Sequence, residues 1–111
     1  MATVETSGTT TTTATTEVTL ATITTAKTFV LNVDVSVLAT GEDITIRGKK
    51  KVLSGGTTRL MTEFEVIVSW FQAVGGLVIE LPPITSTQEC VFTIQPSTAT
   101  SRAWPWSVEV P

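Results

Sequence analysis

The fold is decided by the stretch FVLNVDVSV, residues 29–37. Apolar side chains return at every second position, and polar ones stand between them at Asn32, Asp34 and Ser36. A period of two is the pattern of a half-buried strand, whereas a helix has a longer period. We therefore expect a strand here. Its core face would carry Phe29, Leu31, Val33, Val35 and Val37.

The segment before this stretch predicts a shorter strand over residues 17–25. Its apolar anchors are Val18, Leu20 and Ile23. The odd spacing between Leu20 and Ile23 would place them on opposite faces of a regular strand. A β-bulge, which inserts one extra residue into a strand, would account for this change of face.

A hairpin is predicted after residue 43. The loop Ser54-Gly55-Gly56 suits a three-residue turn, with Gly56 in the left-handed conformation that glycine adopts without strain. The strand before it, residues 43–53, would point Ile44, Ile46 and Val52 inward. The expected register places Arg47 opposite Glu63, Lys51 opposite Arg59 and Ile46 opposite Phe64. This register is self-consistent, because its charged and apolar pairs fall on separate faces.

The second strand of this hairpin is predicted to be the longest in the chain, from Thr57 to Val74. Its inward side chains would be Leu60, Phe64, Val66, Val68 and Trp70. A turn at Gly75-Gly76 would lead into a further strand that places Trp70 opposite Leu81 and Val74 opposite Leu77. Pro82-Pro83 should end that strand, because proline has no amide hydrogen for the ladder, and residues 84–88 are expected to form a loop.

Two more strands are predicted towards the end of the chain. Residues 89–95 would point Cys90, Phe92 and Ile94 inward, and the last strand would carry Arg102, Trp104, Trp106, Val108 and Val110 on one side. Pro105 should confine this last strand to a sheet edge or a bulge. No segment has the pattern of a useful helix. The expected fold is all-β: an antiparallel β-sandwich, or a jelly-roll or tulip-like barrel.

Threonine makes up half of the first 28 residues and includes the unbroken run from Thr9 to Thr13. Residues 1–16 have no apolar face that could offset the entropy lost on ordering, so the segment is expected to be a mobile, extended arm when the protein is alone. Because threonine favours strands, the arm could become ordered by adding to the sheet edge of a neighbour. The predicted organisation is therefore an arm, 1–16, and one β-sandwich domain, 17–111.

Composition excludes several classes of function. The chain of 111 residues has no histidine and one cysteine, which removes the usual general base and zinc ligands and predicts a protein that is not an enzyme and has no metal or cofactor. A net charge of −3 argues against a nucleic-acid partner. No apolar stretch is long enough to span a bilayer, and no signal segment follows Met1, so we expect no membrane partner and synthesis in the cytoplasm.

Candidate sites each have an ordinary structural interpretation. Glu63 and Glu65 share a strand face at a spacing that a glycosidase pair could use, but Arg47 could simply neutralise that face. Cys90 has no histidine to activate it and is expected to be a buried apolar residue. The basic patch, Arg47, Lys49 and Lys51, could contact an acidic partner or discourage aggregation at a strand edge. Trp104 and Trp106 could stack on sugars, but core or interface burial is the favoured interpretation.

Two motifs resemble small all-β proteins encoded among the virion genes of tailed bacteriophages. They are Lys51-Val52-Leu53-Ser54-Gly55-Gly56-Thr57 and Arg102-Ala103-Trp104-Pro105-Trp106. The resemblance spans roughly residues 29–110 and leaves out the threonine arm. It implies a capsid decoration, or cement, protein: a homotrimer on the outer capsid surface of the virion that binds the major capsid protein lattice and has no catalytic residues or small-molecule substrate.

This resemblance and the residues together predict an interface with the capsid or a sister subunit. Its members would be Thr9, Thr10, Thr11, Thr12, Thr13, Trp104 and Trp106. Deletion of residues 1–16 is then expected to abolish capsid association and to leave the body folded. The alternative function is a carbohydrate-binding or receptor-binding module of a phage head or tail fibre, with both tryptophans exposed.

Overall fold

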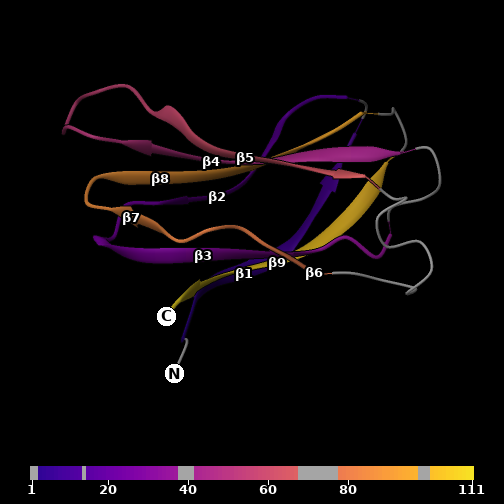
Figure 1. The fold of residues 1–111 in the computed structure, drawn as a ribbon, viewed down its shortest axis with the longest axis horizontal. Helices are drawn as coiled ribbons and strands as arrows, with labels where there is room; N and C mark the ends of the chain where they lie inside the picture. The colour runs from indigo at the N-terminus through magenta and orange to yellow at the C-terminus, as the bar shows by residue number, and fades with distance from the viewer. Residues whose placement is uncertain (1–2, 14, 38–41, 68–77, 98–100) are drawn as a thin grey trace.

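The structure is a computed structural model that describes residues 3–13, 15–37, 42–67, 78–97 and 101–111. Within these residues the chain contains β-strands and no helix. The strands form two antiparallel sheets, which Figure 1 shows as two layers. The predicted all-β class is therefore confirmed.

The first sheet has the strand order β1-β9-β3-β6, and β7 also pairs with β3. Its strands are β1 (Thr3–Thr12), β3 (Lys27–Asp34), β6 (Val78–Glu80), β7 (Ile84–Ser86) and β9 (Arg102–Val110). The second sheet has the order β2-β8-β4-β5. Its strands are β2 (Val18–Ile23), β4 (Asp43–Lys51), β5 (Arg59–Ile67) and β8 (Glu89–Pro96).

One apolar core is formed by side chains from both sheets, and most of it follows the predicted alternation. The predicted core residues that are fully enclosed are Phe29, Leu31, Val33, Val35, Ile44, Ile46, Cys90, Phe92, Ile94, Trp104 and Val108. Val37 is an exception and is exposed. The reason is that β3 ends at Asp34, whose carboxylate accepts a hydrogen bond from the Ser36 amide and turns the chain.

The bulge predicted in β2 is confirmed. Thr19 pairs with Thr93 and Ala21 pairs with Phe92, so Leu20 is the extra residue. As a result, Leu20, Ala21 and Ile23 are all buried.

A second bulge, in β5, was not predicted and changes the end of the β4–β5 hairpin. The predicted pairs Arg47–Glu63 and Ile46–Phe64 are confirmed. Gly48 then pairs with Thr62 and Lys49 pairs with Leu60, which leaves Met61 as the extra residue. Because the bulge shifts the alternation, Leu60 lies on the exposed face and Lys50, instead of Lys51, pairs with Arg59.

The hairpin loop also differs from the prediction in two details. Gly55, instead of Gly56, adopts a positive φ of 78°. Val52 was expected in the core but is exposed, because β4 ends at Lys51 before the alternation reaches it.

The next described strand after β5 lies in the other sheet. The expected turn at Gly75-Gly76 and the partners Trp70, Val74 and Leu77 lie outside the described residues. In the described part, β6 pairs with β3 in the first sheet, with Asn32 opposite Glu80. Residues 84–86, expected to lie in a loop, form β7 on the same strand, and Ile84 is fully buried.

The last strand, β9, is an interior strand between β1 and β3, so the prediction that Pro105 restricts it to an edge or a bulge is wrong. The physical reason lies in the register. The pairing of β3 with β9 covers residues 106–109 of β9 and stops at Val33–Trp106, so the partner of Pro105 is Thr9 of β1. The missing amide hydrogen of Pro105 therefore leaves the ladder with β3 intact.

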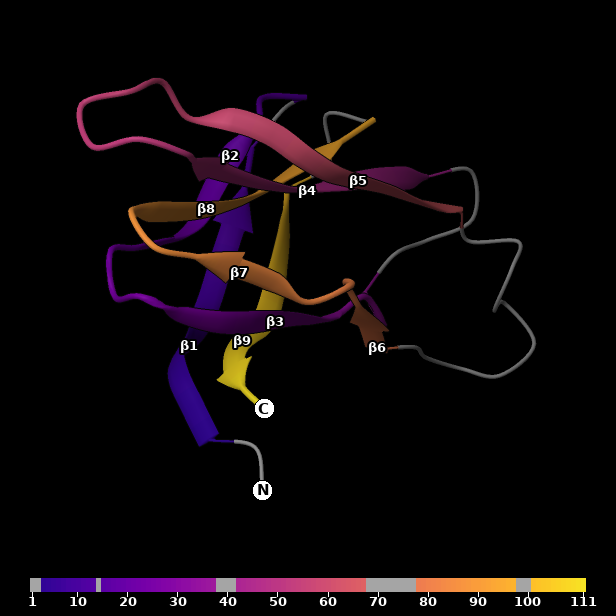
Figure 2. The same ribbon diagram turned by 60° about the vertical axis from the view of Figure 1, so that its left-hand side comes forward.

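The threonine-rich segment is ordered within its own chain, which corrects the expected mobility. β1 runs antiparallel to β9, with Thr6 to Thr12 paired without interruption to residues 102–108. Figures 1 and 2 show it along the outside of β9, with the start of β1 beside the end of β9. The strand addition expected on a neighbour takes place on the protein's own sheet.

Candidate functional site

Threonines of β1 hold both tryptophans of β9. The indole Nε1 of Trp104 donates to Thr12 Oγ1 at 3.0 Å, and Nε1 of Trp106 donates to Thr10 Oγ1 at 2.9 Å. We call these four residues the Thr–Trp clasp. It arises because residues two apart on a strand face the same side, so each indole reaches the β1 threonine two positions beyond its direct partner, which is Thr10 for Trp104 and Gly8 for Trp106.

The clasp consists of four of the residues that the sequence predicts at an interface. Trp104 is 0% exposed and belongs to the core, whereas Trp106 is half-buried. Thr12 is buried and Thr10 is half-buried. Thr9 and Thr11 are exposed on the other side of β1, and Thr13, just after the strand, is also exposed. Members of the predicted set are thus brought together in space, but both indole groups bind the hydroxyl groups of Thr10 and Thr12.

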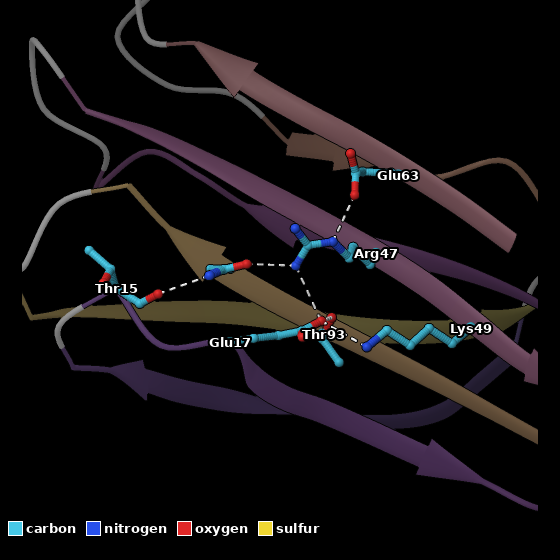
Figure 3. Close-up of polar contacts among 7 residues, drawn as sticks. Thr15, Glu17, Arg47, Lys49, Glu63 and Thr93 are labelled. Atoms are coloured by element: carbon cyan, nitrogen blue, oxygen red, sulfur yellow. Dashed lines mark hydrogen bonds and ion pairs between the residues drawn. The ribbon is translucent and has the colours of Figure 1, made fainter. Parts of the chain in front are cut away.

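An ion-pair network lies on the outer face of the second sheet (Figure 3), and Glu17, just before β2, is at its centre. Its carboxylate is 3.0 Å from Lys49 Nζ and 3.3 Å from Arg47 Nη1, and it accepts a hydrogen bond from Thr93. Arg47 Nε donates to Glu63 Oε2 at 2.8 Å. We call this group the Glu17 cluster. It links the residue just before β2 to the strands β8, β4 and β5.

Gln95 extends this network along β8. It accepts a hydrogen bond from Arg47 Nη1 at 2.7 Å and donates to the Thr15 carbonyl at 3.0 Å. Thr15, which lies between β1 and β2, is thereby held at the face of the second sheet.

The basic patch is neutralised within the chain. Arg47 and Lys49 bind Glu17, and Lys51 lies 3.8 Å from Glu89. Lys50, adjacent in sequence, donates to the Thr85 carbonyl at 2.9 Å. The Arg47–Glu63 pair agrees with the expected neutralised face. The role of Glu17 was missed, because in the sequence it is an isolated acid at the start of a weak strand.

The Glu17 cluster makes stability depend on pH. The hydrogen bond from Thr93 lowers the pKa of Glu17 below its ordinary value; burial opposes this effect, and Lys49 and Arg47 add to it. A carboxyl whose pKa is lower in the folded state stabilises the fold above its unfolded pKa, and this contribution is lost as pH falls through the folded pKa.

We therefore expect Glu17→Gln to lower the free energy of unfolding by about 0.5–1 kcal/mol at pH 7. The difference from the wild type should vanish at a pH well below about 4, where an unperturbed glutamate is protonated. Urea titrations across this range measure it, with Glu65→Gln on the same face as the control. An equal loss at both ends of the range would contradict the assignment.

The remaining candidate groups are structural. Cys90 is fully buried, and desolvation raises the pKa of its thiol to about 11, which keeps it protonated at neutral pH. Among the described residues, no group of three or more acids or cysteines could hold a metal ion. In the same residues, no helix is long and apolar enough to span a membrane.

A shallow hollow lies on the outer face of the first sheet, with a volume of about 270 Å³. It is lined by Asn32, Asp34, Val78, Pro105, Trp106 and Ser107. Asp34 is its acid, and that carboxylate already binds the Ser36 amide. The hollow is therefore a concave surface whose lining residues do not form a catalytic arrangement.

The β4–β5 hairpin end carries an exposed apolar patch. Val52 and Leu53 in the loop and Leu60 and Met61 in β5 are 49–71% exposed. We call these four residues the hairpin tip. Both ribbon views show this loop projecting beyond the neighbouring strand β8 (Figures 1 and 2). Clustered apolar side chains of this kind mark contact surfaces, whereas single ones are common on any protein.

Comparisons with protein-family models, with curated proteins and with solved structures find no match to this chain.

Proposed function

We propose that the protein is a structural protein of a phage virion that decorates the outer capsid surface by binding the major capsid protein. The observation that carries the proposal is the hairpin tip, which exposes two apolar side chains on a projecting loop and two more at the start of β5. Two of them, Val52 and Leu53, belong to a motif that resembles phage virion proteins. The charged network beside the tip is internally paired, so apolar contact would supply the binding energy.

The two facing sheets are proposed to form one β-sandwich. Its core joins residues of both sheets, such as Phe29 of β3 and Phe92 of β8. In this interpretation β1 belongs to the sandwich, and the hairpin tip, instead of a free arm, makes the first contact with the capsid. Many copies on one lattice would multiply weak individual contacts.

The carbohydrate-binding alternative has less support. A sugar platform needs open aromatic faces, and Trp104 has none. Trp106 is half-buried, and its indole N–H already binds Thr10. The indole groups therefore contribute to the packing of β1.

The hairpin tip can be tested by co-sedimentation of the purified protein with heads assembled from the major capsid protein of the same genome. Leu53→Asp should weaken binding by at least about tenfold, because it places a charge in an apolar contact. The fold should be unaffected, since Leu53 is 71% exposed.

Ser54→Asp is the matched control, because it adds the same charge to the same loop without removing an apolar side chain. Its binding should stay within about threefold of the wild type, since rim charges contribute little. Equal occupancy of wild type and Leu53→Asp on the heads would refute the role of the tip. No binding of the wild type, together with retention on a glycan array, would replace the proposal by the carbohydrate-binding alternative.

A further inference from the structure

The edges of the two sheets differ in how well they are protected against pairing with another chain. In the described part of the structure the first sheet ends at β1 and β6 and the second at β2 and β5. An edge strand presents unpaired N–H and C=O groups, and proteins protect such edges with bulges, charges, proline or short length.

Three of these edges carry such protection. β5 contains the bulge at Met61 and the charged residues Arg59, Glu63 and Glu65. β2 has six residues and is interrupted by the bulge at Leu20. β6 has three residues and is followed closely by Pro82-Pro83.

The β1 edge lacks these protections over Thr6–Thr12. This segment contains no charge and no proline, and its register with β9 is unbroken. The irregularity of β1 lies earlier, between Val4 and Thr6. Its inner edge is fixed by β9 and the Thr–Trp clasp, so the outer edge is already extended and needs little further ordering to accept a strand.

We propose that this edge pairs with the β1 strand of a second copy of the chain, antiparallel and across a two-fold axis, and so joins two first sheets into one. An isologous contact places each residue opposite a residue of the same segment. We place the two-fold axis at Thr9, the centre of the unbroken segment, so that Thr9 faces its own copy and Thr6 lies opposite Thr12. Cross-strand threonine pairs stabilise sheets, and no like charges oppose each other within the segment.

The charges of β1 favour the antiparallel arrangement. Glu5, the one charged residue of the strand, lies near its start and binds Lys27 Nζ at 3.1 Å. Antiparallel pairing places the two Glu5 side chains at opposite ends of the joint, whereas parallel pairing would bring them together. A foreign strand would need no such symmetry, and the experiment below separates the two cases.

The inference is independent of the proposed function and needs no capsid for its test. Sedimentation velocity of the pure protein should show a dimer of the 11.8 kDa chain at micromolar concentrations. Thr9→Lys should raise the dissociation constant at least tenfold, because the two new charges face each other near the axis. Thr22→Lys, at an exposed threonine of β2, is the matched control and should leave the dimer intact.

A cross-link provides a second readout that does not depend on the stability of the lysine variant. Thr9→Cys should give a disulfide-linked dimer on mild oxidation, and Thr22→Cys should not. The native Cys90 does not interfere, because it is fully buried. A wild-type monomer or trimer at all concentrations, an intact dimer in Thr9→Lys, or equal cross-linking at both positions would overturn the inference.

Discussion

Deletion of residues 1–13 should lower the free energy of unfolding by on the order of 3–5 kcal/mol, which is a large share of the typical total of about 5–15 kcal/mol. The deletion removes the whole ladder between β1 and β9. It also uncovers Trp104 and removes the hydroxyl groups that accept hydrogen bonds from both indoles. Urea unfolding, followed by the emission of the chain's tryptophans, measures the loss.

The deletion is designed to leave the neighbouring contacts in place. Residue 15 keeps its hydrogen bond with Gln95, and Glu17 keeps its cluster. Deletion of residues 1–5 is the control, since it spares Thr6–Thr12 and removes the exposed Val4 and one surface ion pair. A wild-type unfolding midpoint and unshifted emission in the longer deletion would show that β1 contributes little, as the sequence alone had predicted for residues 1–16.

Truncation of Trp104 should have a comparable effect. It is among the largest fully enclosed side chains, and Trp104→Ala should cost about 3–5 kcal/mol through lost burial and the cavity left behind. Trp106→Ala should cost less, because that ring is half-buried. Thermal and urea unfolding of both variants measure the difference.

The hydrogen bond of Trp104 can be separated from its packing. Thr12→Val keeps the shape of the side chain and leaves the buried indole N–H without its acceptor, which should cost about 1–3 kcal/mol. Thr10→Val should cost less, because Trp106 can reach solvent. If Trp104 instead served a partner, Trp104→Ala would keep the stability of the wild type and lose only binding.

The sequence predicted which face of each strand is buried better than it predicted which strands lie next to each other. Alternation placed residues such as Leu31 and Phe92 correctly in the core, because the period of two follows from the backbone of each strand. The same pattern carries no information on strand order. The pairing of β6 with β3 could therefore not be inferred from local signals.

The unexpected bulge shows how a single residue limits such predictions. Counting every second residue back from Phe64 assigns Leu60 to the core. The extra residue at Met61 reverses that assignment. No local composition marks this position. The exposure of Leu60 was missed for that reason, and the exposure of Val52 was missed because β4 ends at Lys51.

The Thr–Trp clasp left a signal that could have been used. Thr10 and Thr12 have the same spacing of two as Trp104 and Trp106, as two facing strands require. The threonine segment was assigned to a mobile arm because it lacks apolar residues of its own. Its partner strand supplies the apolar surface, and that contribution cannot be seen within the segment.

The pairing of β1 with β9, in which Thr3 lies opposite Val110, also affects the order of folding during synthesis. Translation delivers β1 before its partner β9, so β1 has to wait without a ladder until β9 has been synthesised. An apolar strand in that position would be prone to aggregate during the delay. Threonine combines strand propensity with solubility, and it therefore suits a strand that is synthesised well before its partner.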